Sequence, residues 1–172
     1  MASEKNLFVE ISKAMAEAVS TAEKATVLVN ARRRMPSSGI VYAADLVLTA
    51  DHTVERDDEI SVVLPNGEQI SAEIAGRDPG SDLTLLRLSE AKAVPAAIAN
   101  EEARVGEFVL ALGRPKTSGI EASLGVISAI NGPVRTRRGG TIEKFIRTDA
   151  IPMPGFSGGP LVNAEGKVLG LN

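Results

Sequence analysis

Near the N-terminus, apolar residues recur every three or four positions with polar residues between them. The stretch from Ser3 to about Lys24 has this period, which predicts an amphipathic helix with Ser3 as its side-chain cap. Its apolar positions are Leu7, Phe8, Ile11, Met15, Val19 and Ala22. We expect this face to pack on its own domain; the alternative is that it packs on a partner chain.

After the helix the pattern changes to short segments rich in Val, Ile, Leu and Thr, which predict β-strands. The expected strands are 25–29, 40–49, 60–64, 69–74, 83–88, 108–112, 122–130, 145–147 and 168–171. Pro65-Asn66-Gly67 predicts a hairpin turn, because Gly tolerates the positive φ that tight turns demand. Since few helical spacers separate the strands, an antiparallel sandwich or barrel is favoured over a parallel α/β sheet. The Ala-rich stretch 91–103 is expected to link two sheets.

Composition and charge exclude several classes of protein. The chain has 172 residues, about one domain or two small subdomains. Its 19 basic and 22 acidic residues leave a net charge of -3, and only 3% of residues are aromatic, so nucleic acid is not an expected partner. No apolar run approaches the roughly twenty residues of a membrane span, and the first residues do not form a secretory signal. With no cysteine and a single histidine, a Cys/His zinc site is excluded, and we expect no cofactor.

One serine lies in a sequence that could expose its hydroxyl. Ser157 occurs in the run Gly155-Phe156-Ser157-Gly158-Gly159, with prolines on both sides. Such a turn can bring unhindered backbone N–H groups to one point, as an oxyanion hole requires. The alternative interpretation is a Gly-Pro turn with an incidental serine.

The chain offers one base for this serine and several carboxylates to orient that base. His52 follows the predicted strand 40–49, where a cleft residue could lie. Asp82 directly precedes an apolar strand, so it should be partly buried and need a donor such as an imidazole N–H. Asp51 adjoins His52 and should point to the opposite face, whereas Asp149 is a competitor because it is near Ser157 in sequence.

The order His52, Asp82, Ser157 distinguishes between known triad folds. In α/β-hydrolases the acid and the histidine follow the serine, but no histidine follows Ser157 here. The order His, Asp, Ser on an all-β chain is that of chymotrypsin.

Five motifs in this order resemble the high-temperature-requirement (HtrA/Deg) family of serine proteases. They are SGIV at 38–41, LTADH at 48–52, GRDPGSDL at 76–83, TDA at 148–150 and GFSGGPLV at 155–162. The resemblance implies a mainly β, chymotrypsin-like double barrel preceded by the N-terminal helix. It divides the chain into an oligomerisation segment, 1–24, a first barrel, 25–99, and a second barrel, 100–172, that is truncated at its C-terminus. No PDZ domain is present in the sequence.

The resemblance also implies a function and its residues. It implies a serine endopeptidase of protein quality control that cleaves unfolded or misfolded polypeptides, with His52, Asp82 and Ser157 as the catalytic triad. The N–H groups of Gly155 and Ser157 would form the oxyanion hole, and Ile151 would lie near the base of the specificity pocket. It further implies a homotrimer assembled through the N-terminal segment, with Leu7 and Phe8 as candidate contacts, and location in the bacterial periplasm, cell envelope or an organelle.

Two departures from the family pattern support a second hypothesis. Phe156 replaces the Asn that usually precedes the nucleophile, which would put a large apolar group beside the site. The sequence given also stops at Asn172, where the family continues into a strand that pairs with substrate. The alternative function is therefore a catalytically inactive peptide-binding or regulatory fragment of such a protease.

Two basic clusters are expected to be solvated loop faces. One is Arg32-Arg33-Arg34, and the other comprises Arg135, Arg137 and Arg138. By the resemblance, the second cluster lies in a loop, 134–143, that can sense ligands and reorganise the site.

Overall fold

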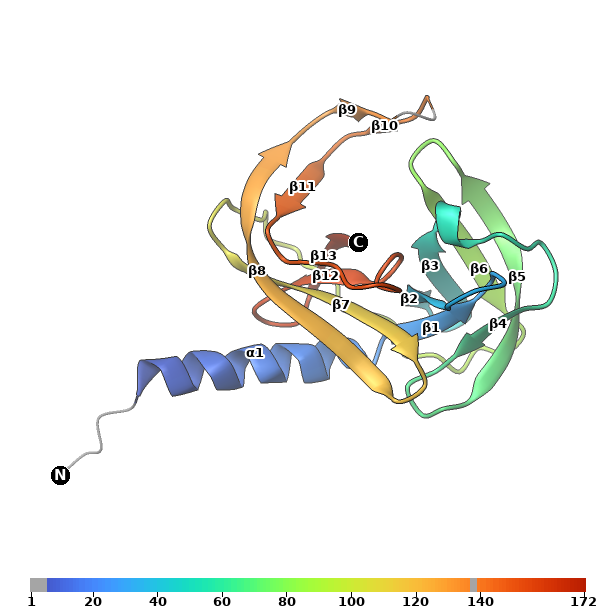
Figure 1. Ribbon diagram of the computed structural model, residues 1–172, viewed down its shortest axis with the longest axis horizontal. Helices are drawn as coiled ribbons and strands as arrows, with labels where there is room; N and C mark the ends of the chain where they lie inside the picture. The colour runs from blue at the N-terminus through green and yellow to red at the C-terminus, as the bar shows by residue number, and fades with distance from the viewer. Residues whose placement is uncertain (1–5, 137–138) are drawn as a thin grey trace.

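The computed structural model describes residues 6–136 and 139–172, which contain a helix followed by two antiparallel β-structures (Figure 1). The first structure is a closed barrel in the strand order β1-β2-β3-β6-β5-β4, and the second is an open, curved sheet in the order β11-β8-β7-β12-β13. The barrel strands are β1 (Thr26–Asn30), β2 (Ser37–Ala43), β3 (Leu46–Ala50), β4 (Ile60–Val63), β5 (Gln69–Asp78) and β6 (Leu83–Leu88). The sheet strands are β7 (Phe108–Lys116), β8 (Gly119–Asn131), β11 (Phe145–Thr148), β12 (Pro160–Asn163) and β13 (Val168–Leu171). The short strands β9 (Val134–Arg135) and β10 (Thr141–Ile142) pair as a hairpin between β8 and β11.

The amphipathic helix forms as α1 (Leu7–Glu23), with Asn6 rather than Ser3 at its N-cap. The Asn6 side chain accepts a hydrogen bond from the N–H of Phe8 at 3.1 Å, so it satisfies one of the helix's unpaired donors. Ser3 lies outside the described residues. The C-terminal half of α1 packs on its own chain through Ala18 and Ala22, as expected.

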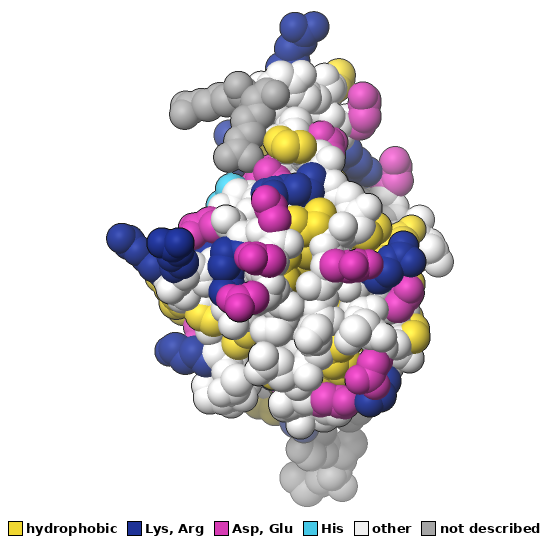
Figure 2. All heavy atoms as spheres, turned by 90° about the vertical axis from the view of Figure 1, so that its right-hand side faces the viewer, with side chains coloured by type: hydrophobic (Ala, Val, Ile, Leu, Met, Phe, Trp, Pro, Cys, Tyr) yellow, Lys and Arg dark blue, Asp and Glu magenta, His cyan; other side chains and the backbone are white. Residues whose placement is uncertain are grey.

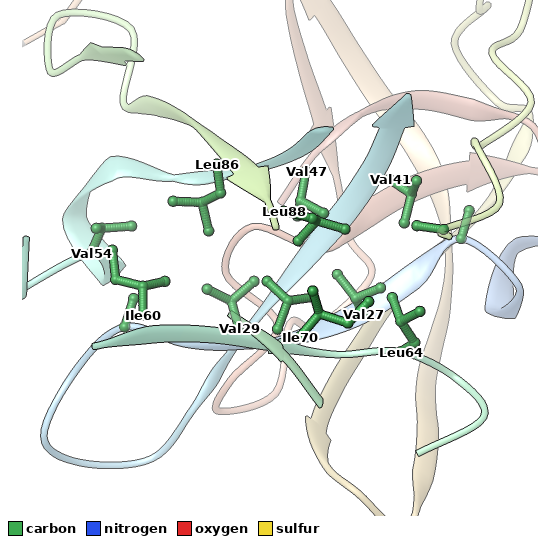
Figure 3. Packing of buried hydrophobic residues seen from close by; sticks show 14 residues of the cluster. Val27, Val29, Val41, Val47, Val54, Ile60, Leu64, Ile70, Leu86 and Leu88 are labelled. Carbon is green, nitrogen blue, oxygen red and sulfur yellow. The ribbon is translucent and has the colours of Figure 1, made fainter. Parts of the chain in front are cut away.

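The barrel encloses a core built from inward-facing aliphatic side chains (Figure 3). Alternate positions of the strands supply it, since successive residues of a strand point to opposite faces. Its most completely buried members are Val27, Val29, Val41, Val47, Val62 and Leu86. Strands β3 and β6 contribute to this core, and the candidate site residues His52 and Asp82 lie near their ends.

The predicted strand 40–49 is wrong as a single element, because the chain reverses direction at Ala44 and Asp45. The two halves, β2 and β3, pair antiparallel with Val41 opposite Val47. The turn contains neither Gly nor Pro, so the sequence lacked the strongest turn signals there. The sequence pattern also did not predict β9, β10 and β12. Of these, β12 begins with Pro160, a residue that normally argues against a strand.

The open sheet is connected to the barrel by a linker and also packs against it. Residues 89–107 connect β6 to β7 and contain no named strand. This agrees with the prediction that the Ala-rich stretch 91–103 links two sheets. Strand β7 then packs beside β1 and β2, and α1 lies against β7 and β12. The loops before β6 and before β12 therefore lie on two β-structures that are in direct contact.

Charged side chains of both signs are interspersed over the barrel side of the molecule (Figure 2). This face does not gather basic side chains into one patch, in agreement with the overall negative charge. Within the described residues, no helix is both long and apolar enough to span a membrane.

Candidate functional site

The structure places the three predicted triad residues in three loops at the ends of strands. His52 lies in a short 3-10 turn, Asp51–Thr53, directly after β3. Asp82 is the residue before β6, and Ser157 lies in the turn that leads into β12. The first two residues therefore belong to the barrel and the third to the open sheet.

His52 and Asp82 are held together by two hydrogen bonds. The ring Nδ1 of His52 lies 2.6 Å from Asp82 Oδ2, and the His52 backbone N–H donates to Asp82 Oδ1 at 2.8 Å. An ionised carboxylate can only accept, so Nδ1 is the donor in this pair, and in a neutral ring the lone pair is then on Nε2. Both side chains are partly open to solvent, at 45% and 43% exposure.

Asp82 is fixed by its own loop in an uncommon backbone conformation. Its φ is +60°, in the left-handed region that residues other than Gly seldom occupy. The preceding turn is braced by Asp78, whose side chain accepts hydrogen bonds from the Gly80 N–H at 3.0 Å and from the Ser81 hydroxyl. The Ser81 hydrogen bond holds the pKa of the Asp78 carboxyl below its ordinary value, although burial opposes this effect. The backbone carbonyl of Asp82 also accepts from the Asp51 N–H at 3.0 Å, which ties this loop to the turn that carries His52.

Ser157 is half-buried in a turn that packs closely against the end of β3. The next residue, Gly158, has φ +83°, and a Cβ there would lie 2.3 Å from the Ser38 carbonyl oxygen and 2.9 Å from the Ala50 nitrogen. Only Gly fits so close an approach. Ala50 is two residues before His52, so the serine turn is pressed against the strand end that positions the base. No hydrogen bond joins Ser157 Oγ to the His52 ring among the described residues; such bonds are often long in unliganded enzymes.

The backbone N–H groups around Ser157 alternate between bonded and unbonded. Phe156 donates to Met153 O at 3.0 Å, and Gly158 donates to Asn172 O at 2.9 Å. The N–H groups of Gly155 and Ser157, in contrast, have no acceptor within the described part of the chain. Two unpaired donors, one on the nucleophilic residue itself and one two residues before it, are what an oxyanion hole needs.

Phe156 does not lie beside the site, so that expectation was wrong. Its side chain is fully buried and packs with Val109, Ile127 and Leu161 in the core of the open sheet. A Cβ on Gly113 would lie only 2.5 Å from the Phe156 ring, so a glycine makes room for it. The large apolar group therefore fills the core of the sheet and is not exposed at the surface of the turn.

The competing carboxylates have other partners. Asp149 Oδ1 accepts from the Val126 N–H at 2.7 Å, and no contact of Asp149 with His52 occurs among the described residues. Asp51 is buried on the other side of its turn, as predicted, and pairs with Arg77. Ile151 is 74% exposed, so its place in a specificity pocket stays a prediction.

A cavity of about 510 Å³ lies beside Asp82, between the loop before β6 and the two edge strands of the open sheet. Its apolar lining includes Ile142, Phe145, Leu161 and Leu171. A groove with apolar walls next to the His–Asp pair could receive an extended peptide.

Sequence reasoning missed an ionic network behind His52. The buried Asp51 carboxylate accepts hydrogen bonds from Arg77 Nε at 2.7 Å and from the Thr84 hydroxyl at 2.8 Å. Arg77 also donates to the Val54 carbonyl at 2.8 Å. These bonds fasten the 3-10 turn of His52 to β5 and β6. In the sequence, Asp51 is a candidate only as an alternative triad member, because nothing there indicates that it pairs with Arg77.

The basic clusters are only partly described. Arg32 donates to the carbonyls of Met35 and Pro36, which closes its own loop. Arg135 is exposed in β9, and Arg137 and Arg138 lie outside the described residues. The Thr136 hydroxyl donates to the Gly80 carbonyl at 2.6 Å, so the loop 134–143 contacts the loop that carries Asp82.

Comparison with known proteins places this geometry in a family. Residues 37–171 match the family model for the trypsin-like peptidase domain. The chain is 38% identical over 143 residues to a probable periplasmic serine endoprotease DegP-like from Halomonas elongata, covering 81% of this chain and 29% of that protein. It is 35% identical over 145 residues to the serine protease Do-like HtrB of Bacillus subtilis, covering 78% and 32%. The chain thus spans about a third or less of these relatives.

Solved structures agree with the sequence comparison. A serine endoprotease from Yersinia pestis superposes with a TM-score of 0.78 at 31% identity, covering 92% of this chain and 56% of that one. The HtrA-type protease AlgW, solved with a tripeptide, gives a TM-score of 0.79 at 33% identity, covering 92% and 53%. The architecture is therefore the expected chymotrypsin-like one, with a closed first barrel and an open second one. The chain belongs to the trypsin-like peptidase domain family, and within that family it is similar to the DegP-like and HtrA-type serine proteases.

Proposed function

We propose that this chain is the protease domain of a serine endopeptidase that cleaves unfolded or misfolded proteins, with His52, Asp82 and Ser157 as its catalytic triad. The observation that carries the proposal is the His52–Asp82 pair, in which both carboxylate oxygens are used and Nε2 makes no hydrogen bond with any described residue. The N–H groups of Gly155 and Ser157 support it further, because they belong to the nucleophile and to the residue two before it and have no acceptor in the described part of the chain.

The proposed chemistry is acyl transfer in two steps. Ser157 Oγ attacks the peptide carbonyl while His52 Nε2 takes the hydroxyl proton, and Asp82 stabilises the imidazolium that forms. The N–H groups of Gly155 and Ser157 bind the oxyanion. The C–N bond then breaks as His52 returns the proton to the leaving amine. A water molecule, deprotonated by His52, releases the acyl group and restores the serine.

The natural setting follows from the same likeness. The curated relatives include proteins named periplasmic serine endoproteases, which supports a location in the periplasm or cell envelope. Unfolded polypeptides are the proposed substrates, with protein quality control as the role. A homotrimer formed through the N-terminal segment is the proposed assembly, with Leu7 and Phe8 as its contacts; their exposure of 68% and 82% at the start of α1 supports an apolar contact surface there.

The direct test is digestion of an unfolded protein such as casein by the chain and by two variants. Ser157→Ala should abolish cleavage, whereas Asp149→Asn should retain it, because an amide oxygen can still accept from the Val126 N–H. Cleavage that persists in Ser157→Ala would refute the proposed nucleophile.

The second candidate function is a peptide-binding or regulatory module without catalysis. The observation behind it is that no hydrogen bond joins Ser157 Oγ to His52 among the described residues, a gap that a catalytic site has to close when substrate binds. In that case the folded chain would bind casein peptides without cleaving them.

A further inference from the structure

Ser38, the second residue of β2, is fully buried, and each of its polar atoms is hydrogen-bonded. Its N–H donates to the Ser157 carbonyl at 3.0 Å, and its hydroxyl donates to the Gly155 carbonyl at 2.8 Å. The same hydroxyl accepts from the Arg114 N–H at 2.8 Å. Ser38 belongs to the SGIV motif at 38–41, which has no part in the proposed acyl-transfer chemistry.

Two of these bonds fix the serine turn at alternate peptide groups. The carbonyls of Gly155 and Ser157 point to Ser38, while the N–H groups of the same two residues remain unpaired. Gly155 has φ +90°, and Gly can leave that conformation more easily than any other residue. We therefore expect the turn to need an external support if both N–H groups are to point at one oxyanion.

Ser38 also connects the serine turn to the strand that leads to the base. Its carbonyl accepts from the Thr49 hydroxyl at 2.7 Å, and Thr49 lies in β3 three residues before His52. Through Arg114 in β7 the same side chain is joined to the open sheet. One buried hydroxyl thus joins the barrel, the sheet and the turn of the proposed nucleophile.

From this geometry we infer that Ser38 is a positioning residue that holds the peptide groups around Ser157 in the conformation of a formed oxyanion hole. It touches no reacting atom. The inference rests on the proposed function, since it assigns a support to that same site. The competing explanation is that Ser38 is an ordinary buried serine whose loss lowers stability alone.

The test compares the rate of Ser157 labelling by a fluorophosphonate, measured by intact mass, with the melting temperature of each variant. Ser38→Ala removes the hydroxyl while keeping the backbone bond to Ser157, and Ser38→Cys keeps a weaker donor in nearly the same volume. The control is Thr26→Val, because Thr26 is also fully buried and its hydroxyl bonds to Ala22 O at 2.9 Å, at the end of α1. Since the chain has no other cysteine, inaccessibility of the introduced thiol to a thiol reagent shows that the Ser38→Cys variant is folded.

We expect labelling of folded Ser38→Ala to fall by roughly 10- to 100-fold, that of Ser38→Cys to fall less, and that of Thr26→Val to stay near wild type. The pH profile of the residual rate should keep its shape, because the His52–Asp82 pair is untouched. Labelling of Ser38→Ala within about threefold of wild type would overturn the inference and leave the proposed function standing. If labelling is lost only in variants that melt below the assay temperature, Ser38 has a structural role alone, and the inference is overturned as well. No labelling of the wild-type chain would refute the proposed function and the inference with it.

Discussion

Replacing Arg77 with Met should destabilise the chain, because it removes the ion pair between Arg77 and the Asp51 carboxylate. The Asp51 side chain is only 5% exposed and lies 2.7 Å from Arg77 Nε, whereas the Arg77 side chain is 32% exposed. Breaking a fully buried ion pair costs about 3–5 kcal/mol. Here Thr84 still donates to Asp51 and water reaches part of Arg77, so we expect a loss of roughly 2–3 kcal/mol in the free energy of unfolding.

The contact of Arg77 with Asp57 adds little to this figure. Asp57 is 86% exposed, and exposed ion pairs contribute at most about 1 kcal/mol. For a chain of this length, a loss of 2–3 kcal/mol corresponds to a fall of about 4–12 °C in melting temperature. Circular dichroism during heating and urea titration would measure both quantities.

A double-mutant cycle tests the reasoning behind this number. Arg77→Met and Asp51→Asn should be non-additive, with a coupling of about 1–3 kcal/mol, because each removes the same interaction. Arg87→Met is the matched control, since Arg87 is an exposed arginine on the adjacent strand β6. A destabilisation by Arg77→Met no larger than that of the control, or strict additivity with Asp51→Asn, would refute the account of the network.

Three further predictions concern the site and its support. Phe156→Ala should lower the free energy of unfolding by about 3–5 kcal/mol, measured by urea titration, because it empties a fully buried position; a loss below about 1 kcal/mol would contradict that placement. Gly158→Ala should prevent formation of the site, since its Cβ would meet the Ser38 carbonyl oxygen at 2.3 Å; a variant with wild-type stability and labelling would show that the turn can open. Asp82→Asn should reduce the turnover number on a peptide substrate by about 10⁴-fold without unfolding the chain, because the ring of His52 loses its carboxylate partner; turnover near that of wild type would reject Asp82 as the orienting carboxylate.

The fold was largely readable from the sequence, because hydrophobic periodicity reports directly on which face of an element is buried. The helix and most strands formed where the pattern indicated, and β2 and β3 were merged only because their turn at Ala44 and Asp45 lacks Gly and Pro. The position of Phe156 could not be read in this way. Its orientation depends on the path of a Gly-rich turn and on the space that Gly113 leaves in the sheet.

The candidate site was predictable as far as its residues carry recognisable chemistry. A lone histidine, a carboxylate before an apolar strand and a serine among glycines limit the possible triads, and the structure brings the first two within hydrogen-bonding distance. The supports of the site were not predictable. The side chains of Ser38 and Arg77 hydrogen-bond to partners that are distant in sequence, and a single sequence has no signal for such tertiary hydrogen bonds.

The central claim is that Ser157 is an activated nucleophile in an assembled site. The measurement that tests it most directly is the intact mass of the chain after incubation with a fluorophosphonate, for the wild type, for Ser157→Ala and for His52→Ala. The account predicts one adduct on the wild type, none on Ser157→Ala, and a strongly slowed reaction for His52→Ala. An unmodified wild-type chain that is folded, or equal modification of Ser157→Ala, would contradict it.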